Sequence, residues 1–236
     1  MPNYIYGRNT VGAYLKSNTN IKKLYVFNKG NFKDIVDIAK GRRIPIEFVE
    51  KFRLDKMVDG SHQGLVIEIE DYKYYSLDEI TKDATHKLVV VCDQLEDPHN
   101  LGAILRTCDA VGVDGVVIGK HRSVGLGSTV AKVSTGAINT VKVHEAVNIV
   151  NTIKALKEAG YWIIAAENGI NAMDYTEFPV DMPIALVVGS EGKGVSRLVL
   201  KECDILTTIP MNGSVNSLNV SVATAVLLYD IARRRR

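Results

Sequence analysis

From Leu88 onward, short apolar runs alternate with stretches of helical periodicity, and this alternation is the strongest constraint on the fold. The first run, LVVVCD, is continuously apolar up to its polar end, as in a strand that is buried on both faces. The other predicted strands are GVVIG, YWIIAAE, IALVVGSE and DILTTIPM. The stretches NLGAILRTCDAVG and EAVNIVNTIKALKEAG place apolar residues three and four positions apart. Strands that alternate with helices predict an α/β fold with a parallel sheet.

The front of the chain has a different organisation. Shorter strand and helix patterns follow one another in mixed order there, and the polar, aromatic stretch DYKYYSLDEITKDATHK ends them. We therefore expect two domains, residues 1–75 and residues 76–236. The first contains 13 Lys and Arg against 9 Asp and Glu. Such an excess more often marks a solvated surface, but it also suits contact with a polyanion.

Several classes of protein are disfavoured by what the sequence lacks. No apolar stretch approaches the roughly 18 residues of a membrane span, and the start MPNYIYGRNT lacks the apolar core of a signal peptide. We expect a cytoplasmic protein without a membrane segment. The three cysteines (Cys92, Cys108 and Cys203) are scattered and lie in apolar runs, which argues against disulfides and against a zinc site. No metal is expected.

Three stretches that follow predicted strands carry more polar groups than a fold requires: DQLEDPHNLGAILRT, VVGSEGKGVS and IPMNGSVNSLN. Ligands bind at the carboxyl ends of strands in open α/β sheets. Each polar residue also has a structural interpretation. Asn100 could cap the following helix, Arg106 could extend along its surface or turn inward to hold a phosphate, and Glu191 could be a solvated loop acid.

Taken together, NLGAILRT after DP, GSEGKG, and IPMNGSVNSLNVSVA resemble the three signature motifs of the SpoU/TrmH-type RNA ribose 2′-O-methyltransferases of the SPOUT superfamily. The resemblance covers roughly residues 88–233. At the front, YGRNTVGAYL and HQG resemble the small, ribosomal-protein-like RNA-binding domain of the 23S rRNA guanosine 2′-O-methyltransferases. The resemblance implies an α/β catalytic domain with a deep trefoil knot, S-adenosylmethionine as cofactor, and RNA, 23S rRNA in particular, as substrate. It also implies a homodimer with the active site at its interface.

The same resemblance implies a set of site residues. The positions that match the family's catalytic set are Asn100, Arg106, Glu191, Ser217 and Asn219. The positions that match its cofactor-binding set are Gly189, Ile209, Met211, Asn212 and Leu218. We expect Arg106 to assist the attacking oxygen electrostatically, because arginine is effectively never deprotonated in proteins. Gly189 is expected to give room for close approach.

The closing helix is expected to be buried. Its predicted apolar face consists of Leu218, Val222, Ala225, Val226 and Tyr229. By the resemblance, this helix would serve both the core and the dimer.

Other functions remain open at this point. A related enzyme could methylate tRNA or a different rRNA nucleotide, as resistance-type relatives do. A protein with the same fold could also act in ribosome assembly as an RNA-binding factor without catalysis. A nicotinamide dehydrogenase is disfavoured, because no glycine-rich fingerprint follows the first strand of the large domain.

Overall fold

The structure, a computed structural model, describes residues 3–16, 21–69, 72–169 and 171–236. The chain divides into two compact units, and the boundary lies between Tyr72 and Lys73. The boundary expected from sequence lies three residues later. Each unit has a hydrophobic core of its own.

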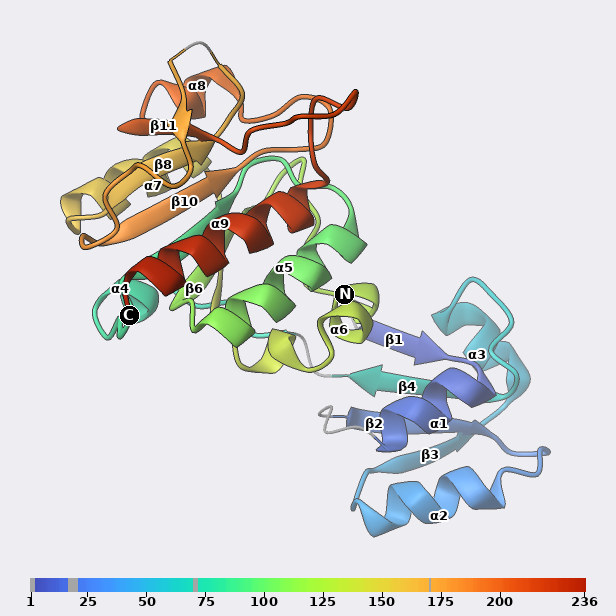
Figure 1. Cartoon of the computed structure of the whole chain (residues 1–236). Helices are drawn as coiled ribbons and strands as arrows, with labels where there is room; N and C mark the ends of the chain where they lie inside the picture. The colour runs from blue at the N-terminus through green and yellow to red at the C-terminus, as the bar shows by residue number, and fades with distance from the viewer. Residues whose placement is uncertain (1–2, 17–20, 70–71, 170) are drawn as a thin grey trace. The chain divides into compact units, whose positions relative to one another are not determined.

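The small unit is a four-stranded sheet with helices on both faces (Figure 1). Its elements are β1 (Asn3–Tyr6), α1 (Arg8–Lys16), β2 (Ile21–Phe27), α2 (Lys33–Gly41), β3 (Ile46–Val49), α3 (Lys51–Met57) and β4 (Leu65–Ile69). The strand order is β1-β4-β2-β3, in which only β2 and β3 run parallel. Helices α1 and α2 bury Leu15 and Ile35 against one face, and α3 buries Leu54 against the other.

The large unit is built on a seven-stranded sheet of order β7-β6-β5-β10-β8-β11-β9, in which every paired strand is parallel. Its strands are β5 (Leu88–Cys92), β6 (Gly115–Gly119), β7 (Val143–Ala146), β8 (Trp162–Ala166), β9 (Met173–Asp174), β10 (Ile184–Val188) and β11 (Ile205–Thr208). Its helices are α4 (Leu77–Thr81), α5 (Pro98–Val111), α6 (Ser128–Ser134), the 3₁₀ turn Ala137–Asn139, α7 (Ile149–Glu158), α8 (Arg197–Leu200) and α9 (Val220–Arg234).

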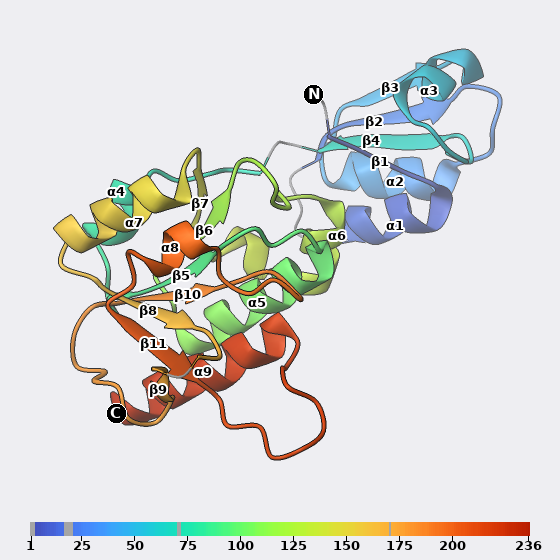
Figure 2. The same ribbon diagram turned by 90° about the horizontal axis from the view of Figure 1, so that it is seen from above.

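Helices cover both faces of this sheet, as the sequence predicts. Helices α5 and α9 pack together on one face, and α7 and α8 lie on the other (Figure 2). The apolar runs form the central strands, and all residues of β5, β6 and β10 are buried. No helix within the described part of the chain is long and apolar enough to cross a membrane.

Helix α5 begins earlier than the cap interpretation of Asn100 requires. Asp97 is the N-cap, and its carboxylate accepts a hydrogen bond from the His99 amide at 2.9 Å. Pro98 occupies the first helical position, where its missing N–H costs nothing. The interpretation of Asn100 as a cap is therefore wrong, and its buried side chain is available for another role.

Two helix predictions need correction. Glu145 and Ala146, expected in a helix, belong to β7, and α7 begins after Asn148, whose side chain caps the Asn151 amide. Helix α9 does bury an apolar face, but a different one from that expected; its largely apolar buried residues are Val220, Thr224, Leu227, Leu228, Asp230 and Ile231. Val222 and Tyr229 are 48% and 56% exposed. This helix is apolar on two faces, and periodicity alone could not tell which of them packs on α5.

Candidate functional site

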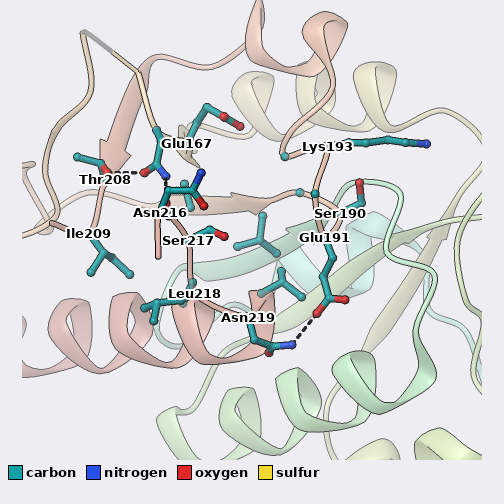
Figure 3. Close-up of a pocket in the computed structure, with 18 of the residues that line it drawn as sticks. Glu167, Ser190, Glu191, Lys193, Thr208, Ile209, Asn216, Ser217, Leu218 and Asn219 are labelled. Carbon is teal, nitrogen blue, oxygen red and sulfur yellow. Dashed lines mark hydrogen bonds between the residues drawn. The ribbon is translucent and has the colours of Figure 1, made fainter. Parts of the chain in front are cut away.

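A cavity of about 540 Å³ lies where β8, β10 and β11 end. Its size falls within the roughly 300–1,000 Å³ range of small-molecule sites. Three walls surround it: residues 166–168 after β8, residues 188–194 after β10, and residues 207–219, which lead from β11 into α9 (Figure 3). It therefore occupies the edge of a parallel sheet where ligands bind.

The second wall is a turn that closes on itself. Ser190 and Gly194 exchange two backbone hydrogen bonds, at 3.1 and 3.0 Å. Gly192 and Gly194 have φ values of +78° and +66°, which favour glycine. A Cβ on Gly189 would overlap the carbonyl group of Gly194. Gly189 lines the cavity, but the room that it leaves is filled by the turn itself.

Two buried or half-buried carboxylates fasten this turn to the sheet. Asp93, which follows β5, accepts a hydrogen bond from the Ser196 amide at 2.7 Å. Glu167, which follows β8, accepts one from the Val195 amide at 3.0 Å. The turn is thus fixed by its own backbone and by two neighbouring strand ends.

The first wall was not anticipated from sequence. Asn168 accepts a hydrogen bond from the Thr208 hydroxyl at 2.7 Å and donates one to the Asn216 carbonyl at 2.9 Å. It joins the end of β8 to Thr208 and Asn216, near the two ends of the third wall. Glu167 is the last residue of the predicted strand YWIIAAE and Asn168 follows it, so the rule of carboxyl strand ends could have found them.

The third wall contains most of the expected cofactor-binding residues. Ile209, Met211 and Leu218 line the cavity, whereas Asn212 is exposed and does not. Ser217, expected to be catalytic, also lines the cavity and is exposed. Its hydroxyl lies on the side that faces Glu191 (Figure 3).

Three of the expected catalytic residues meet in one hydrogen-bonded cluster. The side-chain amides of Asn100 and Asn219 both donate to Oε1 of Glu191, at 2.9 and 2.6 Å. Asn219 also donates to Oδ1 of Asn100 at 3.0 Å. In the sequence, Glu191 lies 91 positions after Asn100 and Asn219 lies 119 positions after it. Oε2 of Glu191 bonds to no other described residue and is open to a hydrogen-bond donor.

Asn219 has a second role in the same position. Its Oδ1 accepts from the amides of Ser221 and Val222, at 3.0 and 3.4 Å, and so caps α9. Because the oxygen is committed to the helix, the nitrogen is held toward Glu191.

Arg106 lies apart from this cluster. It is exposed on α5, about 9 Å along the helix axis from Asn100 by helix geometry. Within the described residues it has no hydrogen bond or ion pair, and it does not line the cavity. Its guanidinium is available to an external anion.

The described residues contain no group of three or more His, Cys, Asp and Glu side chains arranged to hold a metal ion.

Two family models match the chain. The model described as the SpoU rRNA methylase family matches residues 87–229, and the model described as RNA 2′-O ribose methyltransferase substrate binding matches residues 4–75. Together they span both compact units.

The similarity to individual proteins extends over nearly the whole chain. A Bacillus subtilis protein named "Putative TrmH family tRNA/rRNA methyltransferase YacO" is 44% identical over 98% of this chain and 96% of its own length. A Staphylococcus haemolyticus protein with the same family name is 46% identical over 98% and 95%. Among solved structures, the SpoU methyltransferase AviRb from Streptomyces viridochromogenes, in complex with AdoMet, has a TM-score of 0.71. It covers 98% of this chain and 90% of its own at 21% identity, which is a likeness of fold.

Proposed function

The chain belongs to the SpoU rRNA methylase family, and on this premise we propose that it transfers a methyl group from S-adenosylmethionine to a ribose 2′-hydroxyl of RNA, specifically of a guanosine in 23S rRNA. The observation that carries the proposal is the cluster of Asn100, Glu191 and Asn219 beside a cavity at the carboxyl edge of the sheet. A structural loop acid has no need of two amides from distant elements.

The cavity suits the proposed cofactor. Its backbone-rich turn and the apolar side chains of Ile209 and Leu218 offer a surface for a flat base, while polar groups line the remaining walls. When bound, the cofactor supplies an activated methyl group on a sulfonium. Gly189, Ile209, Met211 and Leu218 would hold it; the exposed Asn212 would take part only through a rearranged loop.

The chain's own residues would then orient the hydroxyl and stabilise its developing charge. Asn100 and Asn219 fix Glu191, whose free oxygen would accept a hydrogen bond from the RNA. Ser217 would orient the same group. Arg106 would bind the ribose and its phosphate and stabilise the attacking oxygen, because preorganised donors favour the charge that forms in the transition state. As the carbon–sulfur bond breaks and the carbon–oxygen bond forms, the hydroxyl proton would leave to water or a phosphate oxygen.

Two partners belong to the proposal. The small unit, with its basic excess and its match to a substrate-binding model, would hold the RNA. A second copy of the chain would cover the exposed apolar side of α9, where Val222 and Tyr229 are 48% and 56% exposed. Such a homodimer would also bring a second surface toward Arg106. Sedimentation equilibrium measures this state directly.

The decisive experiment is transfer of a labelled methyl group onto purified 23S rRNA and onto tRNA, followed by mapping of the modified nucleotide. Methylation of a guanosine ribose in 23S rRNA supports the proposal. The relatives' names leave tRNA open as the substrate, and labelling of tRNA alone would replace the rRNA assignment. If the protein did not bind S-adenosylmethionine, the proposed methyltransferase activity would be refuted.

Arg106→Ala tests the proposed mechanism within that assay. We expect methyl transfer to fall at least about 1,000-fold, since a lost transition-state donor costs about 100- to 1,000-fold and the phosphate contact is lost as well. Cofactor affinity should stay within about twofold, because Arg106 does not line the cavity. Arg106→Lys keeps the charge but loses the planar fork, and should recover only part of the rate. Full activity in Arg106→Ala would remove Arg106 from the mechanism.

A further inference from the structure

Glu167 is a carboxylate in the cavity that neither the sequence motifs nor the hydrogen-bonded cluster uses. It directly follows β8, and its backbone amide donates to the Thr207 carbonyl on β11 at 2.9 Å. Its side chain lines the cavity and extends from the end of β8 toward the turn that carries Lys193 (Figure 3).

The carboxylate is held in one orientation. It accepts a hydrogen bond from the Val195 amide at 3.0 Å through Oε2. A Cβ on Gly194 would lie 2.6 Å from the same oxygen, so the carboxylate packs directly against the turn. Oε1 has no hydrogen bond to a described residue. A fixed carboxylate with a free oxygen is ready to accept donors from a ligand.

Within the described residues, no cation neutralises this group. Among the described ion pairs none includes Glu167, and the one cationic residue that lines the cavity, Lys193, extends away from it (Figure 3). The partner that Glu167 lacks must therefore come from the ligand or from water.

We propose that the Glu167 carboxylate accepts hydrogen bonds from the ribose hydroxyl groups of an adenosyl ligand that binds in this cavity. The proposal rests on the proposed function and adds a specificity-determining residue to it. An acidic residue at the end of a parallel strand binds ribose hydroxyls in other nucleotide sites of α/β proteins.

The order of the strands favours the ribose over other parts of the ligand. Strand β8 lies between β10 and β11. Glu167 therefore lies between the turn that carries Glu191 and the segment that carries Ile209. In an adenosyl sulfonium the ribose joins the base to the reacting sulfur, so a base against Ile209 and a sulfur near Glu191 leave the ribose at Glu167.

The ammonium group of the methionine part is a poorer partner. It is attached to the same carbon as a carboxylate, whose like charge offsets the attraction to Glu167. The two ribose hydroxyls are neutral donors that can share one carboxylate, and hydrogen bonds to an ionised acceptor are the stronger kind.

The test compares the wild-type chain with Glu167→Gln by titration calorimetry. The probes are S-adenosylhomocysteine, its 2′-deoxy and 3′-deoxy analogues, and 5′-methylthioadenosine, which keeps the ribose but lacks the amino-acid part. Gln retains a carbonyl for the Val195 amide, so the turn should stay intact. Glu177→Gln, the same change at an exposed residue outside the cavity, is the matched control.

We expect Glu167→Gln to lower the affinity for S-adenosylhomocysteine and the affinity for 5′-methylthioadenosine about tenfold each. Glu177→Gln should change neither affinity. Removing the engaged hydroxyl should weaken binding about tenfold in the wild type and less than twofold in Glu167→Gln. If removing the hydroxyl weakened binding as much in Glu167→Gln as in the wild type, the two losses would be additive and the proposal would be overturned. A loss confined to S-adenosylhomocysteine would also overturn it, in favour of the ammonium group.

Failure of this proposal is distinct from failure of the proposed function. A wild-type protein that binds S-adenosylhomocysteine and methylates RNA but shows additive losses keeps its function without this residue. A wild-type protein that binds none of the probes loses both. If Glu167→Gln is unstable, Glu167→Asp keeps the charge at a shorter reach and should show the same loss of discrimination between ribose and deoxyribose.

Discussion

The turn after β10 and the segment before α9 form facing walls of one cavity, but they are built in opposite ways. The turn, residues 188–195, closes through reciprocal backbone bonds and is fastened by Asp93 and Glu167. The segment, residues 209–219, is exposed from Asn212 to Asn219. Within the described residues, it is held by the hydrogen bond from Asn168 to Asn216 and by the hydrogen bonds of Asn219 to Asn100 and Glu191.

This difference separates a preformed part of the site from an adjustable part. The glycine turn needs no ligand to keep its shape, because its hydrogen bonds are internal to the chain. The facing segment makes few hydrogen bonds to the rest of the chain. It leaves polar groups in solvent, and its Val215 is 63% exposed. We infer that ligands order the segment around a turn that stays fixed, as expected where local stability is low.

The largest expected effect comes from a methyl group in the fixed wall. In Gly189→Ala the Cβ would overlap the Gly194 carbonyl, so the turn must open. We expect S-adenosylmethionine affinity to fall at least about 100-fold, measured by calorimetry. Gly213→Ala in the facing segment is the control, since nothing lies within 4 Å of the added atom. Equal losses in the two variants would contradict the distinction between the walls.

An intermediate effect is expected at the residue that bridges the walls. Glu191→Gln replaces a charged acceptor of two amides by a neutral one, and charge-assisted hydrogen bonds are the stronger kind. We expect single-turnover methyl transfer to slow about 30-fold while cofactor affinity changes less than about threefold. A variant that lost affinity and kept its rate would make Glu191 a binding residue instead.

The smallest effect is expected where the adjustable wall is fastened. Asn168→Ala removes the bonds to Thr208 and Asn216, worth about 1 kcal/mol. Cofactor affinity should fall about fivefold, and amide exchange should accelerate in residues 212–218 but not in residues 190–194. Asn171→Ala, at an exposed neighbour, should change neither. Faster exchange in the turn would show that the two walls are coupled.

Sequence patterns predicted the large elements better than the small ones. Continuous apolar runs identified β5, β6, β8 and β10, because strands buried on both faces need them. Strand β9 has two residues, too few for any period. Helix α4 is also short, although Ser76 and Glu79 form a capping box that the sequence displays.

For the site, motifs indicated which residues to consider but not which of them meet. Neither spacing nor periodicity relates Asn100 to Asn219, because the two are joined only by the folding of the sheet and its covering helices. Asn168 and Glu167 were missed because both lie outside the three polar stretches that match the family's motifs. Their importance comes from β8 lying between β10 and β11, which is a property of strand order.

Asn219 uses the two ends of one amide for two separate tasks, the oxygen to start α9 and the nitrogen to hold Glu191. Under the proposed function, thermostability and turnover depend on the same side chain, and evolution has little freedom to adjust one without the other. A screen for folding alone would accept another capping residue here, such as Asp, although Asp lacks the amide nitrogen that holds Glu191.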